Sequence, residues 1–128
     1  MRILLDTHSF LWFVAGDARI GSTARSLIAD LNNTALLSIA SLWEIAIKVS
    51  LGKLTLTEPY ETLIAEQLAL NAINVLPIDF DDLIEVARLP FHHRDPFDRL
   101  LVAQAIARGL PIVSRDPVLD DYPIERLW

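Results

Sequence analysis

The chain has 128 residues, 52% of them hydrophobic and 22% charged, which excludes a disordered chain and predicts a single domain over residues 1–128. The absence of cysteine excludes disulfides and thiolate metal sites, and no apolar run is long enough to cross a membrane. The net charge of −6 argues against tight, non-specific binding of nucleic acid, although carboxylates gathered around a cation would be neutralised locally.

The predicted elements alternate between short apolar strands and amphipathic helices. In chain order they are a strand at 2–5, helices at 7–15 and 22–31, a strand at 34–37, helices at 39–51 and 59–70, a strand at 73–78, helices at 80–89 and 95–108, a strand at 110–114, and a last short strand around Ile124. Pro77 favours an edge position for the third strand. This alternation predicts an α/β fold with a mainly parallel sheet covered by helices on both faces.

Two acidic residues follow predicted strands. Asp6 comes directly after the first strand, and Asp116 lies just past the fourth. Active sites of open parallel sheets lie outside the carboxyl ends of the strands, so this shared placement favours a functional role. Both residues also have a structural interpretation, because Asp is a common helix N-cap and Asp before Pro117 commonly starts a turn.

Three further acids belong to predicted helices. Glu44 lies in a mostly apolar helix, where a buried carboxylate must be paired, coordinated or protonated, and Lys48 is the alternative partner at the favourable spacing. Asp95 precedes Pro96 as a natural N-cap, and Asp98 then occupies the third helical position. We favour helix capping for Asp95 and metal binding for Asp98.

The available ligand types favour Mg²⁺ or Mn²⁺ over zinc. Zinc sites usually combine nitrogen and sulfur ligands, whereas a carboxylate set suits the harder cations. We interpret His92 and His93 as loop residues beside the cleft. Arg99 and Arg115 lie close to the acidic motifs, and we expect them at a substrate phosphate, the alternative being ordinary exposed charges.

Four motifs together resemble those of the PIN-domain nucleases, and more narrowly the VapC-type toxins of toxin–antitoxin pairs. They are Ile3-Leu4-Leu5-Asp6-Thr7-His8, Ser41-Leu42-Trp43-Glu44, Asp98-Arg99-Leu100-Leu101-Val102-Ala103-Gln104-Ala105 and Val113-Ser114-Arg115-Asp116. The resemblance extends from Arg2 to Asp116, and its most specific stretch runs from Phe91 to Arg99. The chain departs from the family pattern at His8, where Asn is usual, while Ser114 fits the usual Thr or Ser.

The resemblance implies a three-layer fold with a central parallel sheet, and RNA cleavage that depends on Mg²⁺ or Mn²⁺. It implies that the metal-binding acids are Asp6, Glu44, Asp98 and Asp116, and we expect Thr7, Asp95 and Ser114 to support them. It also implies a homodimer and an antitoxin that blocks the cleft. The lack of cysteine and of a signal peptide agrees with a cytoplasmic location.

Two other functions compete with this interpretation. A phosphatase of the haloacid dehalogenase type also has an Asp after its first strand, but it needs a second Asp two residues later, where this chain has His8. A binding module would use the same acids only as helix caps. The kind of RNA that is cleaved stays open, because loop and single-strand recognition depends on surface shape.

Overall fold

The apolar runs of the sequence form one five-stranded sheet in the computed structural model, which describes residues 1–128. The strands are β1 (Arg2–Leu5), β2 (Thr34–Ser38), β3 (Asn74–Leu76), β4 (Ile112–Val113) and β5 (Arg126–Leu127). Their order is β3-β2-β1-β4-β5 and every neighbouring pair is parallel, so the predicted parallel sheet is confirmed. The strand followed by Pro77 lies at an edge, as predicted.

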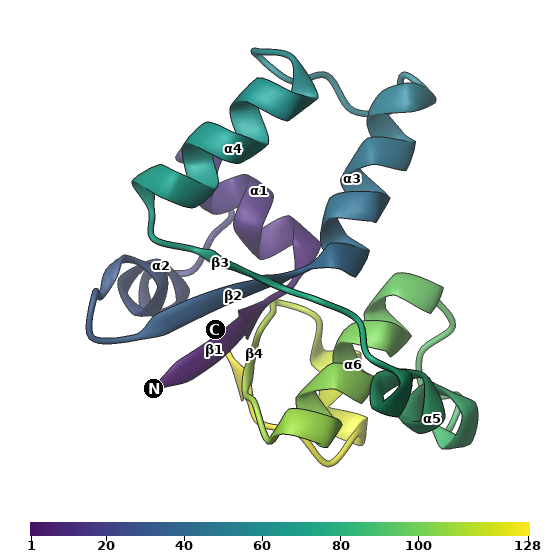
Figure 1. Ribbon diagram of the computed structural model, residues 1–128. Helices are drawn as coiled ribbons and strands as arrows, with labels where there is room; N and C mark the ends of the chain where they lie inside the picture. The colour runs from purple at the N-terminus through teal and green to yellow at the C-terminus, as the bar shows by residue number, and fades with distance from the viewer.

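Helices cover both faces of this sheet (Figure 1). On one face lie α1 (Thr7–Ala15), α2 (Ser22–Ala29), α3 (Ile39–Ser50) and α4 (Tyr60–Leu70), and on the other lie α5 (Phe80–Arg88) and α6 (Pro96–Arg108). The three-layer α/β architecture expected from the sequence is therefore confirmed. No helix has the length and apolar character required to cross a membrane.

Alternate strand residues supply two separate hydrophobic cores. Ile3 and Leu5 of β1 pack with the first group of helices, whereas Leu4 between them packs toward α6. Strands β2 and β4 divide their side chains in the same way. Burial on both faces explains why these strands read as uninterrupted apolar runs instead of alternating ones.

The structure differs from the predicted elements at α2 and near the C-terminus. Helix α2 ends at Ala29, earlier than expected, and its N-cap is Gly21. A Cβ atom at position 21 would lie 3.1 Å from Nε1 of Trp128, so glycine allows the indole to approach closely. Residues 117–121, expected to be irregular, form a 3₁₀ helix, η1 (Pro117–Asp121), and β5 comes after Ile124.

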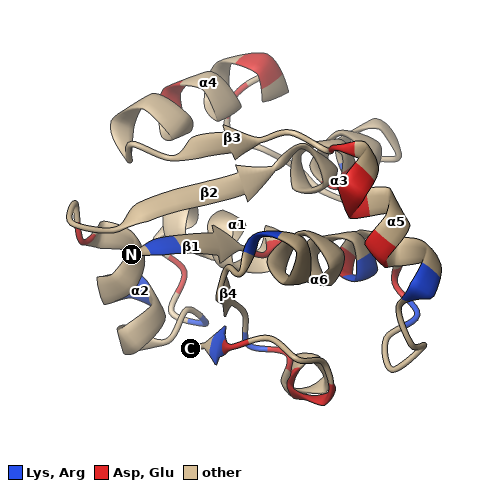
Figure 2. Cartoon of the chain, turned by 60° about the horizontal axis from the view of Figure 1, so that its bottom comes forward, with Lys and Arg blue, Asp and Glu red and all other residues tan.

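The negative net charge is spread over several surfaces. Figure 2 shows acidic residues on α4, on α5 and along the segment that contains η1. A functional site therefore has to be located from the contacts of individual carboxylates and not from the overall charge.

Candidate active site

Asp6 and Asp116 lie together at the carboxyl edge of the sheet. The backbone N–H of Asp6 donates to the carbonyl of Val113 over 3.1 Å, which joins the end of β1 to the end of β4. Oδ1 of Asp6 accepts from the N–H of Ser9 (2.8 Å), and Oδ1 of Asp116 accepts from the N–H of Val118 (3.0 Å). Each acid therefore caps a helix with one oxygen and keeps Oδ2 for other contacts.

A pocket of about 290 Å³ opens beside these two carboxylates. Its lining residues are Asp6, His8, Trp12, Arg115, Asp116 and Pro117. The carboxyl ends of β1 and β4 thus border a space that a small ligand or part of a larger one can enter, as the strand-end placement predicted.

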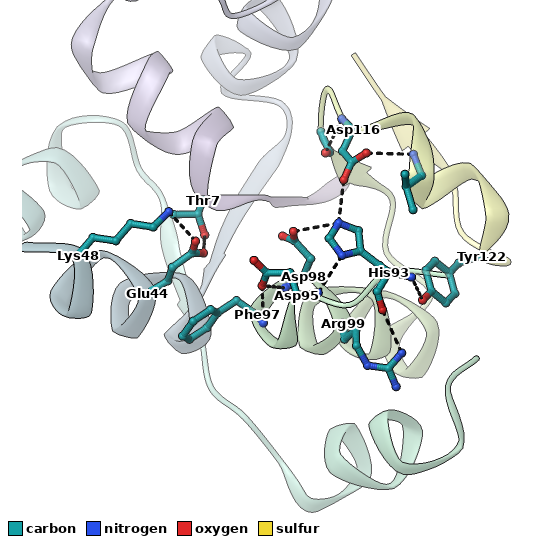
Figure 3. A network of polar contacts seen from close by, with 12 residues as sticks. Thr7, Glu44, Lys48, His93, Asp95, Phe97, Asp98, Arg99, Asp116 and Tyr122 are labelled. Atoms are coloured by element: carbon teal, nitrogen blue, oxygen red, sulfur yellow. Dashed lines mark hydrogen bonds and ion pairs between the residues drawn. The ribbon is translucent and has the colours of Figure 1, made fainter. Parts of the chain in front are cut away.

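Glu44 is only 6% exposed and is held by two polar partners on α1 and α3. Oε1 accepts from the hydroxyl of Thr7 over 2.7 Å, and Oε2 lies 2.9 Å from Nζ of Lys48. The predicted ion pair with Lys48 is therefore present. Figure 3 shows the Glu44 carboxylate on the side of α3 that faces the N-terminus of α6.

Asp95 caps α6, as expected. Its Oδ1 accepts from the N–H groups of Phe97 (2.8 Å) and Asp98 (3.2 Å). This cap holds the first turn of α6 in place and thereby fixes the backbone of Asp98. Asp95 supports the site through this helix start.

Asp98 is the carboxylate most strongly affected by its surroundings. Burial raises its pKa from 3.8 to about 7, and the negative charges of Asp95, Asp6 and Glu44 push the pKa in the same direction, while His93 opposes them. A carboxyl group whose pKa responds to all of these acids must lie near them. The structure therefore places Asp98 near Asp6, Glu44 and Asp95, and His93 joins Asp98 to Asp116.

The raised pKa of Asp98 predicts that a rise in pH destabilises the metal-free protein and that a bound metal ion restores the lost stability. In metal-free protein the folded state keeps the Asp98 proton up to about pH 7, whereas the unfolded state loses it near its ordinary value of 3.8. The folded state then binds more protons across this window, so the contribution of Asp98 to the free energy of unfolding should fall as pH rises through it. Mn²⁺ should accordingly raise Tm much more at about pH 8 than at about pH 5.

Thermal unfolding of the wild type and of Asp98→Asn, with and without Mn²⁺ at both pH values, measures this effect. The difference between the two proteins isolates the contribution of residue 98 from that of other titrating groups. An equal shift by Mn²⁺ at both pH values would contradict the assignment of the raised pKa to this carboxyl group.

His93 is the residue of this region that the sequence analysis did not select as a site residue. Its Nε2 lies 2.8 Å from Oδ2 of Asp116 and 3.2 Å from Oδ2 of Asp98. It lies between two acids that belong to different elements, Asp98 in the first turn of α6 and Asp116 after β4 (Figure 3). The sequence offered one indication of this role. His93 lies two residues before the capping Asp95, and the loop that leads into a helix at the site must pass close to the site.

Thr7 and Ser114 act on the site through hydrogen bonds. Oγ1 of Thr7 bonds Glu44 and also lies 3.0 Å from Oγ of Ser41, linking α1 to α3. Oγ of Ser114, which is fully buried, accepts from the N–H of Asp116 over 3.1 Å. Both residues therefore fix the backbone or side chain of an acid, and their role in supporting a metal site stays a prediction.

Arg99 does not reach the acids, contrary to the expectation that it binds phosphate. Its guanidinium is buried and donates to backbone carbonyls of the preceding segment, the shortest contacts being 2.9 Å to Pro90 and 3.1 Å to Leu89. The ring of Phe91 lies 3.8 Å from the guanidinium carbon. The guanidinium is occupied by these contacts, so Arg99 organises the loop before α6.

Arg115 keeps a position suited to substrate. Its side chain is exposed, lines the pocket beside Asp6 and Asp116, and forms no ion pair with any acid. The guanidinium lies 5.9 Å from the centre of the Trp12 ring. A cation at the mouth of an acidic pocket is well placed to hold a phosphate group.

The carboxylates fit a hard divalent cation. Oxygen ligands dominate Mg²⁺ and Mn²⁺ sites, and the acids present here supply carboxylate oxygens from four separate segments. Burial and the neighbouring carboxylates raise the pKa of Asp98, and a bound cation would favour its ionised form. The site has the donor set and the charge that Mg²⁺ or Mn²⁺ requires.

Comparison with known proteins identifies this arrangement. The PIN-domain family matches residues 3–125 of the chain. The chain belongs to the PIN-domain family. The resemblance seen in the four sequence motifs is thereby confirmed, and the match includes the positions of all four acids.

One curated relative shares part of this PIN domain. It is Ribonuclease VapC16 of Mycobacterium tuberculosis, which is 38% identical over 55 residues. The shared segment covers 43% of the chain and 39% of the relative's length.

Solved structures with the same fold cover nearly the whole PIN domain. The structure of VapBC2 from Rickettsia felis, bound to a DNA fragment from its promoter, has a TM-score of 0.76 and 18% identity over 99% of this chain and 98% of that chain. DNA-bound VapBC from Salmonella typhimurium has a TM-score of 0.71 and 16% identity over 99% and 97%. VapBC-5 from Mycobacterium tuberculosis has a TM-score of 0.61 and 21% identity over 98% of each chain. At these identities the similarity establishes the fold.

Proposed function

We propose that this PIN domain is a metal-dependent endoribonuclease that acts as the toxin of a toxin–antitoxin pair. The observation that carries the proposal is the position of Asp98, whose pKa is raised to about 7 by burial and by the charges of Asp95, Asp6 and Glu44, and which His93 joins to Asp116. Membership of the PIN-domain family and the partial match to a protein named as a ribonuclease support the same activity.

The four acids would hold Mg²⁺ or Mn²⁺. When bound, such a cation lowers the pKa of a coordinated water and stabilises charge on a phosphate and on the leaving oxygen. The chain's own residues have separate tasks around it. Glu44 is oriented by its ion pair with Lys48, Arg115 binds the phosphate at the pocket mouth, and Asp116 is the proposed acceptor of the proton that the attacking water loses.

An antitoxin and a second copy of the chain are the proposed protein partners, and the proposed location is the cytoplasm. Support for the antitoxin comes from the similar structures, which include a member of the VapBC family of toxin-antitoxin systems and two DNA-bound VapBC proteins. A second pocket of about 660 Å³ adjoins the first and shares His8 and Trp12 with it. An antitoxin segment seated there would lie next to the acids and block substrate entry.

Cleavage of a mixed RNA pool by the purified, partner-free chain tests the activity. We expect RNA to be cut in the presence of Mn²⁺ or Mg²⁺ and left intact when EDTA replaces the metal, because the acids alone repel the phosphate backbone. A small phosphomonoester serves as the control substrate. Folded protein that cuts no RNA with metal present, or that hydrolyses only the phosphomonoester, would contradict the proposal.

A further inference from the structure

His93 is held by hydrogen bonds on every side. Its backbone N–H donates to the hydroxyl oxygen of Tyr122 over 2.9 Å, and its Nδ1 accepts from the backbone N–H of Asp95 over 3.1 Å. Its Nε2 faces Asp116 and Asp98 (Figure 3). The ring therefore has one orientation, set by Asp95 and Asp98 at the start of α6 and by Asp116 after β4.

The contact with Asp95 determines which ring nitrogen carries the hydrogen. A backbone N–H can only donate, so Nδ1 must offer its lone pair to the N–H of Asp95. The ring hydrogen then lies on Nε2, where Oδ2 of Asp116 accepts it over 2.8 Å and Oδ2 of Asp98 lies 3.2 Å away. His93 and these acids lie close enough together to resemble a three-ligand metal site, but Nε2 has no lone pair left for a cation.

We propose that His93 is a positioning residue, which holds the carboxylates of Asp98 and Asp116 in one orientation through its Nε2–H and leaves the metal site with oxygen ligands alone. This inference rests on the metal site of the proposed function. The loop before α6 would thus orient the metal-binding carboxylates, a role that neither the family match nor the four acids reveal.

The position of Nε2 between the two carboxylates addresses a specific difficulty of the site. Asp98 lies in the first turn of α6, and Asp116 follows β4. Like charges on their two carboxylates favour the separation of these segments. An N–H donor between them restrains both carboxylates, so their oxygens stay together as ligands for a cation. Partners that orient metal ligands in this way typically contribute a factor of about 10–100 in metal affinity.

Titration of Mn²⁺ into the wild type, His93→Ala and His93→Gln, followed by calorimetry, tests the role. We expect Ala to raise the Kd for Mn²⁺ by about 10–100-fold. Gln should recover much of the loss, because its amide NH₂ can take the place of Nε2–H. An unchanged Kd in His93→Ala would overturn the proposal.

Pulsed electron paramagnetic resonance of bound Mn²⁺ separates positioning from direct ligation. We expect the wild-type spectrum to lack the coupling of a directly coordinated imidazole nitrogen, since Nε2 is protonated. A strong nitrogen coupling that disappears in His93→Gln would show that His93 is a ligand and would refute the inference.

Tyr122→Phe is the matched control for loosening of the loop. It removes the hydroxyl that accepts from His93 and donates to the carbonyl of Pro90, but it keeps the imidazole. We expect a smaller rise in Kd than in His93→Ala. An equal rise in both, with no rescue by Gln, would assign the effect to the loop. A wild type that binds no Mn²⁺ would refute the proposed function itself, whereas normal binding by His93→Ala refutes only this inference.

Discussion

Replacement of Asp98 by Asn is expected to reduce RNA cleavage by more than about 100-fold, exceeding the loss typical for groups that only orient a ligand. Asn has the shape of Asp but lacks the negative charge that attracts the cation. The fold should survive, because the carboxyl of Asp98 makes no capping contact and its ionisation in the metal-free protein opposes folding. Asp6→Asn should be similarly inactive and folded.

The measurement is the rate of RNA cleavage at saturating Mn²⁺, with circular dichroism and Tm to verify folding. Asp81→Asn is the matched control, because Asp81 is an exposed acid on α5 without an ion pair and its loss changes the net charge equally. If Asp98→Asn and Asp81→Asn cut RNA at the same rate, Asp98 is not part of the active site.

Replacement of Arg99 by Met is expected to lower the free energy of unfolding by about 3 kcal/mol, or roughly 10 °C in Tm. Met preserves the apolar stem but removes the guanidinium donor of the Leu89 carbonyl in a buried setting, and it leaves the Pro90 carbonyl with the Tyr122 hydroxyl as its remaining donor. Lys should be a poor substitute, because a single ammonium cannot span carbonyls that a planar guanidinium contacts together.

Arg115→Ala provides the contrast for Arg99→Met. Its exposed guanidinium bonds no carbonyl or carboxylate, so the free energy of unfolding should change by less than about 0.5 kcal/mol. Its loss should instead weaken RNA cleavage, mainly through a higher KM. A stability loss in Arg115→Ala equal to that of Arg99→Met would contradict the different roles that the structure gives these residues.

The strands and most helices were predictable because their signals are local. Asp6 and Asp116 could be placed near each other from sequence, since both follow strands whose carboxyl ends meet at one edge of a parallel sheet. Asp95 and Gly109 mark the two ends of α6 through their own backbone preferences. Such features need no knowledge of the rest of the chain.

The roles of His93 and Arg99 depend on contacts that sequence patterns do not contain. The imidazole of His93 meets Asp116, which is 23 residues away, within a loop that has no periodicity. Arg99 has the spacing of an exposed cation near acids, but the turn from Leu89 to Arg94 folds its carbonyls around the guanidinium. A charged residue next to a motif could face the substrate or could bind backbone carbonyls, and only the structure of the folded loop distinguishes the two roles.

The capping contacts at the strand ends affect how relatives of this chain should be judged for activity. Asp6, Asp95 and Asp116 each close a helix start, so a descendant that had lost its chemistry would still be under selection to keep Asp, Asn or Ser there. The side chains of Glu44 and Asp98 cap no helix, so these two acids would be the first to be replaced. Whether a homologous sequence keeps Glu44 and Asp98 is therefore the more informative sign of whether that homologue is an active nuclease.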